Sequence, residues 1–406
     1  MAVESVSVKS AYEREELLNG CQAVSHAVRL ADVDVVAAYP IRPYTEVMDQ
    51  ISKFIADGEF YAEYIIADGE HSQFEIGKHA VSVGARAFVG SSGTGWMYAT
   101  EALVATATDR LPLVAMCGNR ALDDPGAFGV EHNDALMLRD VGWNLVWVDT
   151  AQQALDTTLL AYRIAEDPAV MMPTAVSLDG AFLTHSQHMV KIPTKEAVDQ
   201  FLPPYNPKVK LDPDNPVSIA PQANEDWVME IRRQNYEAGK RAKGVIYRAY
   251  REFNEIFGTH YENPFFEEFM TADADFVLIG MGSIAMPAKA AVKEMRRKGV
   301  KAGYISLHWL RPFPTEELRK ALSRFRGIGV IDRDFAIGTP DLGGVLFHEI
   351  RSCMYRSSSR PNILNFISGL GARDTSIEDC MRMIDIVSHA KGDETEQVVT
   401  WIGVRE

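Results

Sequence analysis

The chain has 406 residues, of which 47% are hydrophobic, and a formal net charge of −15 at pH 7. This length allows two or three domains with separate cores, and this composition excludes disordered and fibrous proteins. The acidic balance argues against nucleic acid or an anionic membrane as a partner, because phosphate contacts need clustered lysine and arginine. Residues 1–10 lack the features of a signal peptide and no apolar run reaches membrane-spanning length, so we expect a cytoplasmic protein.

Short apolar runs alternate with helix-like segments through the first half of the chain. We expect strands at 34–39, 85–90, 111–117, 145–148 and 170–176. Residues 94–108 and 151–166 carry small or apolar side chains at every third or fourth position, which predicts helices. This alternation is typical of a doubly wound parallel sheet in an α/β fold.

Residues 203–221 contain six prolines and predict an irregular linker. A charged helix is expected at about 226–257. A second α/β unit follows, with strands expected at 276–280, 303–307, 328–331 and 363–367 and helices at 285–298, 315–325, 343–356 and 376–389. We therefore predict three regions, 1–202, 203–270 and 271–406.

The four cysteines, Cys21, Cys117, Cys353 and Cys380, are far apart and form no Cys-x-x-Cys pair. This spacing predicts buried thiols of a reducing compartment. It provides no framework for an iron–sulfur cluster or a zinc ion within this chain.

Residues 39–45 read Tyr-Pro-Ile-Arg-Pro-Tyr-Thr and follow the first expected strand. In open α/β sheets, ligands bind beyond the carboxyl ends of the strands. The guanidinium of Arg42, in a loop stiffened by two prolines, is therefore well placed to bind an anion.

Two further segments join expected strands to helices. Residues 68–72 read Asp-Gly-Glu-His-Ser, so that Glu70 begins a helix-like stretch, where an acidic residue alone predicts only helix capping. Residues 84–95 read Gly-Ala-Arg-Ala-Phe-Val-Gly-Ser-Ser-Gly-Thr-Gly, a strand followed by a small-residue turn. In isolation such a turn is also compatible with a phosphate cradle.

A fourth segment, 119–122, reads Asn-Arg-Ala-Leu and follows the strand expected at 111–117. Together these segments resemble the α subunits of 2-oxoacid:ferredoxin oxidoreductases, which carry Tyr-Pro-Ile-x-Pro-x-Thr, Ser-Glu-His-Ser, Gly-Ala-Arg-x-Phe-x-x-x-Ser-Ser-x-Gly and Asn-Arg-Ala-Leu blocks. The resemblance extends over most of the chain. It implies a thiamine-diphosphate-binding domain of the pyrimidine type at 1–202 and a transketolase C-terminal-like α/β domain at 271–406.

The resemblance also implies roles for individual residues. Glu70 would bind the aminopyrimidine of thiamine diphosphate and favour its imino tautomer, with Pro40 and Ile41 beside the cofactor. Arg120 would bind the substrate carboxylate in a bidentate pair. Residues 91–95 would pack near the pyrimidine, since the diphosphate and its Mg²⁺ belong to the β subunit in this family.

The same resemblance implies several partners. These are a β subunit that carries the diphosphate site, a γ/δ-type ferredoxin-domain subunit with [4Fe-4S] clusters, and ferredoxin as the electron acceptor. We expect a dimer of heterotrimers. A non-catalytic assembly subunit is a weaker alternative, because Glu70 and Arg120 are intact.

Arg42 stands where the family usually has threonine. A second guanidinium beside Arg120, with Tyr44 nearby, predicts a two-arginine clamp that needs a second negative charge on the substrate. The resemblance then points to oxalate oxidoreductase, which would convert oxalate into two carbon dioxide molecules without coenzyme A. Pyruvate or 2-oxoglutarate oxidation with coenzyme A is the alternative.

Residues 123–134 depart from the family's small, apolar loop. The segment contains two acids, Asp123 and Asp124. The pair Ala127-Phe128 that follows has a glycine on either side. We expect a mobile loop in which Asp123 and Phe128 reach the substrate and a carboxylate competes with it. A polar surface turn is the alternative.

The Gly-x-Gly pattern at Gly280 and Gly282 is too weak to predict a dinucleotide site and is interpreted as a structural turn.

Overall fold

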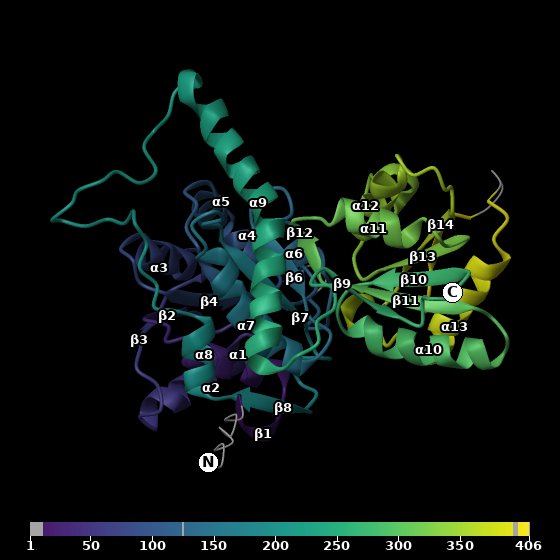
Figure 1. Cartoon of the computed structure of the whole chain (residues 1–406), viewed down its shortest axis with the longest axis horizontal. Coiled ribbons are helices and arrows are strands. Elements are labelled where there is room, and N and C mark those ends of the chain that lie inside the picture. Colours follow the sequence, from purple (N-terminus) through teal and green to yellow (C-terminus); the bar gives the residue numbers. More distant parts are fainter. Residues whose placement is uncertain (1–10, 124–125, 393–396, 406) are drawn as a thin grey trace, which may run out of the picture.

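The computed structural model describes residues 11–123, 126–392 and 397–405. Two lobes, each built on one sheet, lie side by side (Figure 1). The first sheet consists, in spatial order, of β12 (Trp309–Arg311), β6 (Asn144–Trp147), β7 (Thr174–Asp179), β5 (Val114–Asn119), β4 (Ala87–Ser91), β2 (Val35–Ala38) and β3 (Glu63–Ile66). All neighbouring strands are parallel except β12, which runs antiparallel to β6. The predicted doubly wound parallel sheet is therefore confirmed.

Helices pack on this sheet because their apolar residues form one continuous core with its buried strands. They are α1 (Gly20–Leu30), α2 (Thr45–Ala56), α3 (Glu70–Ser82), α4 (Thr94–Tyr98), α5 (Thr100–Thr108), α6 (Asn133–Leu136), α7 (Ala151–Ala165) and α8 (Lys195–Phe201). An antiparallel pair, β1 (Tyr12–Leu18) with β8 (His188–Pro193), lies outside the main sheet and was not predicted.

Two sequence expectations need correction here. The helix predicted at 94–108 is interrupted at Ala99, whose ψ of 4° is not helical, so it forms α4 and α5. The strand predicted at 170–176 begins only at Thr174. The preceding apolar residues form a turn, because Met171 has a φ of 45° and Pro173 has no N–H for strand pairing.

The linker at 203–221 contains no helix or strand, as its prolines predicted. It leads into the 33-residue helix α9 (Glu225–Phe257), which ends at Gly258 in the left-handed conformation (φ 66°) that favours glycine. The C-terminal part of α9 packs on the first lobe through buried residues at helical spacing, Ala238, Ala242, Val245, Ala249 and Phe253. Its N-terminal part and part of the linker project beyond that lobe (Figure 1).

The second sheet consists, in spatial order, of β15 (Val399–Trp401), β14 (Asn362–Ile367), β13 (Gly327–Asp332), β10 (Phe276–Gly280), β11 (Ala302–Leu307) and β9 (Phe266–Phe269). Only β9 is antiparallel to its neighbour. Its helices are α10 (Ala285–Arg297), α11 (Thr315–Leu322), α12 (Val345–Met354) and α13 (Ile377–His389), with short 3₁₀ turns η1 (Gly282–Ile284), η2 (Pro340–Leu342) and η3 (Leu370–Ala372).

The two lobes interlock at one point. After β11, in the second sheet, the chain passes through His308 and adds β12 to the edge of the first sheet. The region expected at 271–406 thus contributes one strand to the other lobe.

All four cysteines are buried and free, as predicted. Within the described ranges, no helix is both long enough and apolar enough to cross a bilayer.

Candidate functional site

The loops that carry the predicted site residues meet at the carboxyl edge of the first sheet. Arg42 follows β2 and Arg120 follows β5, while the turn 92–93 joins β4 to α4. Glu70 is the first residue of α3, shortly after β3. Parallel neighbouring strands bring these four connections to one side of the sheet.

Glu70 lies in a confined position. Its side chain is buried (8% exposed), and its carboxylate accepts no hydrogen bond within the described residues. Gly95 packs against it so closely that a Cβ there would lie 2.7 Å from Oε1 of Glu70. A carboxylate that is not paired within the protein is free to accept a hydrogen bond from a donor on a ligand.

Arg120 is also buried (6% exposed) and is incompletely paired. Its Nη1 donates to the carbonyl oxygen of Arg42 at 3.2 Å, and its Nη2 lies 3.4 Å from Oδ2 of Asp123. Its Nε is buried and has no partner within the described residues. The ring of Phe128 stacks 5.5 Å from the guanidinium.

A short glycine-rich segment separates Glu70 from Arg120. Gly93 adopts a φ of 52°, and a Cβ there would lie 2.9 Å from Nε of Arg120. Gly95, two residues later, contacts Glu70 in the same way. Segment 93–95 therefore brings the carboxylate and the guanidinium to either side of one turn, where larger residues do not fit.

Asp134 holds this turn in place and was not predicted as a site residue. It is fully buried, and its carboxylate accepts hydrogen bonds from the backbone N–H groups of Gly93 and Arg120 and from Nδ2 of Asn119, each at 2.9 Å. Burial raises the pKa of this carboxyl above its usual value. A lone acid carries no spacing signal, so the sequence offered no pattern from which this role could be predicted.

The other predicted site residues differ from one another in exposure and in contacts. The side chain of Arg42 is exposed and forms no hydrogen bond or ion pair within the described residues. Pro40 is exposed and Ile41 is half-buried beside it. Tyr44 is fully buried in the core, where its hydroxyl lies 3.5 Å from the carbonyl oxygen of Ala37, so the structure does not bring it to the expected substrate position.

The loop at 123–134 is partly described. The side chain of Asp123 is 37% exposed and lies 3.4 Å from Oγ1 of Thr94, and Phe128 is 75% exposed. Asp124 and Pro125 lie outside the described residues. Asp123 and Phe128 both contact Arg120.

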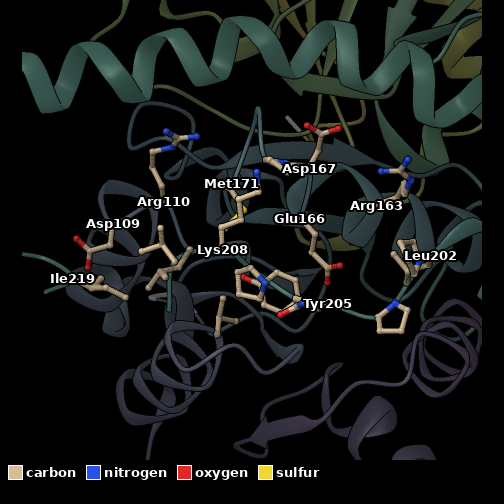
Figure 2. Close-up of a pocket in the computed structure, with 18 residues that line it drawn as sticks. Asp109, Arg110, Arg163, Glu166, Asp167, Met171, Leu202, Tyr205, Lys208 and Ile219 are labelled. Carbon is tan, nitrogen blue, oxygen red and sulfur yellow. The ribbon is translucent and has the colours of Figure 1, made fainter. Parts of the chain in front are cut away.

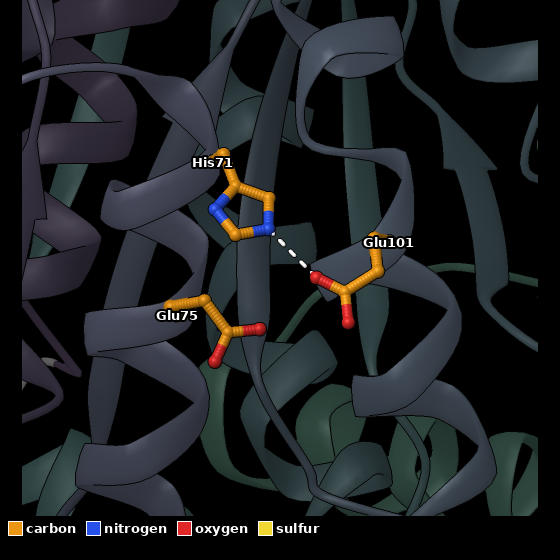
Figure 3. A group of neighbouring side chains, drawn as sticks. All are labelled: His71, Glu75 and Glu101. Atoms are coloured by element: carbon orange, nitrogen blue, oxygen red, sulfur yellow. Dashed lines mark hydrogen bonds and ion pairs between the residues drawn. The ribbon is translucent and has the colours of Figure 1, made fainter.

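Beside Glu70, an exposed cluster lies between α3 and α5 (Figure 3). Nε2 of His71 lies 2.7 Å from Oε2 of Glu101, and Glu75 completes the group. Lys78 donates to Oε1 of Glu75 at 2.9 Å and lies 2.8 Å from its Oε2, so both oxygens of that carboxylate are engaged. The cluster is therefore best described as a surface ion-pair network.

The lobes meet through a buried polar cluster around Asp179, at the end of β7. Asp179 accepts hydrogen bonds from Nε2 of His132 at 2.7 Å and from N and Oγ of Ser283 at 2.8 and 2.6 Å, and it pairs with Arg333. Burial alone would raise the pKa of Asp179, but His132 and Arg333 hold it well below its usual range. Gly282 in the Gly-x-Gly turn has a φ of 72°, and a Cβ there would lie 2.6 Å from Asp179, so this turn is an inter-lobe contact.

A cavity of about 590 Å³ lies elsewhere, between the linker and the first lobe (Figure 2). Arg110, Glu166 and Tyr205 are among its lining residues. Both carboxylate oxygens of Glu166 accept hydrogen bonds from Arg86, each at 2.7 Å. None of the loops that carry Arg42, Glu70 or Arg120 lines this cavity, so it is separate from the candidate site.

Comparisons with protein families match both lobes. Residues 26–251 match the family described as "Pyruvate flavodoxin/ferredoxin oxidoreductase, thiamine diP-bdg". Residues 274–380 match "Pyruvate:ferredoxin oxidoreductase core domain II". The first range also includes the linker and most of α9, and the second lies in the region that follows α9.

Comparisons with individual proteins point to the same family. The chain is 37% identical to pyruvate synthase subunit PorA of Methanothermobacter thermautotrophicus, over 96% of this chain and 98% of the relative. It is 36% identical to ketoisovalerate oxidoreductase subunit VorA of Pyrococcus abyssi, over 95% and 97%. The fold resembles 2-oxoglutarate:ferredoxin oxidoreductase from Magnetococcus marinus, with a TM-score of 0.67 and 18% identity over 91% of this chain and 65% of that chain.

Proposed function

This chain belongs to the 2-oxoacid:ferredoxin oxidoreductase family as an alpha subunit, and we propose that it binds the aminopyrimidine of thiamine diphosphate and the carboxylate of the 2-oxoacid. The observation that carries this proposal is the placement of Glu70 and Arg120 on either side of segment 93–95. One group suits a cofactor ring and the other suits an anionic substrate. Their separation by one turn would place cofactor and substrate next to each other.

The residues at this edge fit the cofactor that the family implies. Glu70 has no donor within the described residues, and the hydroxyls of Ser91 and Ser92 are buried without a partner there. An aminopyrimidine would supply such partners. When bound, thiamine diphosphate supplies a carbon nucleophile and stores the electrons released with carbon dioxide.

We assign the protein's own contribution to three residues. Glu70 accepts a hydrogen bond from the pyrimidine and thereby sets the proton distribution on that ring. Arg120 binds and orients the substrate carboxylate, and its burial strengthens this pair because water is excluded. Asp134 fixes the backbone of both Arg120 and Gly93 and so keeps the two binding groups in register.

The relatives bear on the choice of substrate. Their names refer to pyruvate and ketoisovalerate, both of which are 2-oxo monocarboxylates. These comparisons favour the pyruvate-type alternative over oxalate, which has no support among them. We therefore propose a coenzyme A-dependent oxidation of a pyruvate-type 2-oxoacid.

Oxalate is the second candidate, and one observation favours it. The side chain of Arg42 is exposed, and the backbone carbonyl oxygen of the same residue accepts a hydrogen bond from Arg120. The carboxylate of Asp123 also pairs with Arg120. A small dianion would find two guanidinium groups at this position, whereas the second cation has no partner on a monocarboxylate.

The remaining parts of the reaction fall to other subunits in our proposal. The chain offers no cysteine framework for a cluster, so [4Fe-4S] clusters would lie on a γ/δ-type ferredoxin-domain subunit and deliver electrons to ferredoxin. A β subunit would hold the diphosphate with Mg²⁺. The assembly would be a dimer of heterotrimers.

The test uses the complex purified with its partner subunits, with kcat/KM measured for pyruvate plus coenzyme A and for oxalate. Reduction of a low-potential dye is the readout. The pyruvate-type proposal expects a clear preference of the wild type for pyruvate. Arg42→Thr should then change pyruvate turnover by less than roughly threefold, since a monocarboxylate does not use a second guanidinium.

The oxalate candidate expects the opposite result. The wild type would prefer oxalate, and Arg42→Thr would lower kcat/KM for oxalate by about ten- to a hundredfold, the loss of one charge-assisted hydrogen bond of roughly 1.5–3 kcal/mol. Arg297→Thr, at an exposed arginine on α10, is the control for a general loss of charge. An assembled complex with cofactor that oxidises neither a 2-oxoacid nor oxalate would contradict the proposed function itself.

A further inference from the structure

A second group of chemically competent side chains lies where the chain crosses from one sheet to the other. His308 stands between β11 of the second sheet and β12 of the first. Asp149 follows β6, the neighbour of β12, and Glu267 lies in β9, the neighbour of β11. One nitrogen and two carboxylate oxygens from these residues all lie within 4.8 Å of one another.

The carboxylate of Asp149 lacks the partners that a buried charge needs. Its side chain is only 3% exposed, and Oδ1 is buried without a hydrogen-bond partner within the described residues. Oδ2 lies 3.4 Å from Nε2 of His308, which is longer than an ordinary N–H···O hydrogen bond. A buried carboxylate without hydrogen-bond donors destabilises the folded chain unless a cation binds to it.

The distance between Asp149 and His308 suits a shared cation. Two ligand bonds of about 2.1 Å at a tetrahedral angle place the ligand atoms about 3.4 Å apart. This is the separation observed between Oδ2 of Asp149 and Nε2 of His308. One imidazole with two carboxylates is a ligand set for a borderline divalent ion such as Zn²⁺.

Glu267 provides the third ligand. Nζ of Lys289 lies 2.8 Å from Oε2 of Glu267, which leaves the other carboxylate oxygen available. Neighbouring acids are already engaged, since Glu268 pairs with Arg324 and Asp273 pairs with Arg296.

An open path leads to this position. A surface pocket of about 800 Å³ is lined by Glu267, His308 and Gln153, among other residues. Asp149 does not line the pocket and is buried beside His308, which does. A hydrated ion can therefore reach the ligands from solvent and lose its water there.

We propose that Asp149, Glu267 and His308 bind one structural divalent cation of the Zn²⁺ class at the junction of the two sheets. The ion would bridge β9 of the second sheet and the end of β6 in the first. It would neutralise Asp149 and hold the lobes at a fixed relative position. Asp149 follows β6 at the carboxyl edge of the first sheet, where β7 separates it from β5, and none of the three proposed ligands lies in the connections that carry Arg42, Glu70 or Arg120.

The experiment uses the full chain, stripped with a chelator and titrated with Co²⁺, whose visible d–d absorption reports tetrahedral nitrogen and oxygen ligands. We expect saturation at about one equivalent and displacement of the signal by Zn²⁺. Zn²⁺ should also raise the Tm of the stripped chain, because an ion that binds only the folded state stabilises it.

Variants locate the ion. Asp149→Asn and Glu267→Gln preserve side-chain shape, and each should weaken Co²⁺ binding at least about tenfold. Glu101→Gln removes a ligand of the exposed cluster beside Glu70 and should leave the Co²⁺ titration unchanged. Circular dichroism of each stripped variant checks that it is folded.

Two results would overturn the proposal. The first is a folded wild-type chain that gives no d–d absorption with Co²⁺ and no rise in Tm with Zn²⁺. This result would make Asp149 and His308 a simple ion pair. The second is a Co²⁺ signal that survives Asp149→Asn and disappears in Glu101→Gln, which would place the ion at the exposed cluster.

Discussion

Two carboxylates of this chain, Asp179 at the lobe interface and Glu70 at the sheet edge, are both buried but differ in their surroundings. Asp179 accepts hydrogen bonds from His132 and Ser283 and pairs with Arg333. Glu70 accepts none within the described residues and lies against Gly95. A buried charge whose donors are all present stabilises the fold, whereas one without donors is available to a ligand.

The difference separates two uses of the same chemical group. Removing Asp179 should harm the folded state and remove an inter-lobe contact. Removing the charge of Glu70 should leave the fold intact and harm the reaction. The three experiments below compare the two regions.

Glu70→Gln should have the largest effect, on activity alone. In the assembled complex we expect turnover to fall on the order of 10²- to 10⁴-fold, because an amide cannot favour the required pyrimidine tautomer as a carboxylate does. The free energy of unfolding of the chain should fall by no more than about 0.5 kcal/mol, because the amide replaces a charge that accepts no hydrogen bond within the described residues. Steady-state dye reduction and urea unfolding are the two measurements.

Glu316→Gln is the matched control, because Glu316 is also a first-turn glutamate, on α11. It loses only an interaction with the helix dipole, worth about 0.3–1 kcal/mol of stability. If Glu70→Gln behaves like Glu316→Gln, with normal turnover, Glu70 is a helix-capping residue and has no part in the reaction.

Asp179→Asn should have the largest effect on stability. It leaves Arg333 and His132 buried without their anion, so we expect the free energy of unfolding to fall by about 3–5 kcal/mol in a urea titration. Asp385→Asn removes an exposed carboxylate that pairs with His389 and should cost less than about 0.5 kcal/mol. A loss below about 1 kcal/mol for Asp179→Asn would mean that water replaces the pair and that the cluster does not hold the lobes together.

Glu131→Gln should have the smallest effect and depend on pH. Burial, with the neighbouring Asp134, raises the pKa of Glu131 to about 7 from its ordinary value of 4.5. The folded chain thus holds this proton more tightly than the unfolded chain, so the wild type loses stability as pH rises from about 4.5 to about 7. Glutamine has no such proton.

The Tm of Glu131→Gln relative to wild type should therefore be higher at pH 8 than at pH 5. The change should be at most a few degrees, roughly, because solvent reaches part of this side chain. Differential scanning calorimetry at both pH values provides the comparison. A Tm difference that is the same at pH 5 and pH 8 would show that Glu131 does not titrate differently in the folded state.

Local patterns predicted most of the secondary structure and the general position of the site. The strand expected at 276–280 is β10 residue for residue, because a short apolar run that follows Asp275 and ends at a Gly-x-Gly turn is typical of a buried strand. Arg42, Glu70 and Arg120 came to one edge because each directly follows a strand or begins the next helix. Sequence periodicity and motif position both carry that information.

Other features depend on contacts between distant residues and were missed. β12 has only three residues, and nothing in its sequence indicates that it pairs with β6. The four donors around Asp179 come from segments far apart in the chain. Tyr44 was misplaced because it lies next to the loop in sequence while its ring packs into the core beneath β4.

The pairing of β12 with the first sheet affects the order in which the chain can fold during synthesis. Chains are made from the N-terminus, so the first lobe emerges with β6 at an open edge, and the strand that covers it follows only after α9 and much of the second sheet. Open edges can pair with strands of other molecules. A nascent or truncated chain that ends before Trp309 therefore exposes a template for aggregation, and the synthesis and pairing of β12, rather than completion of β7, is the step that removes it.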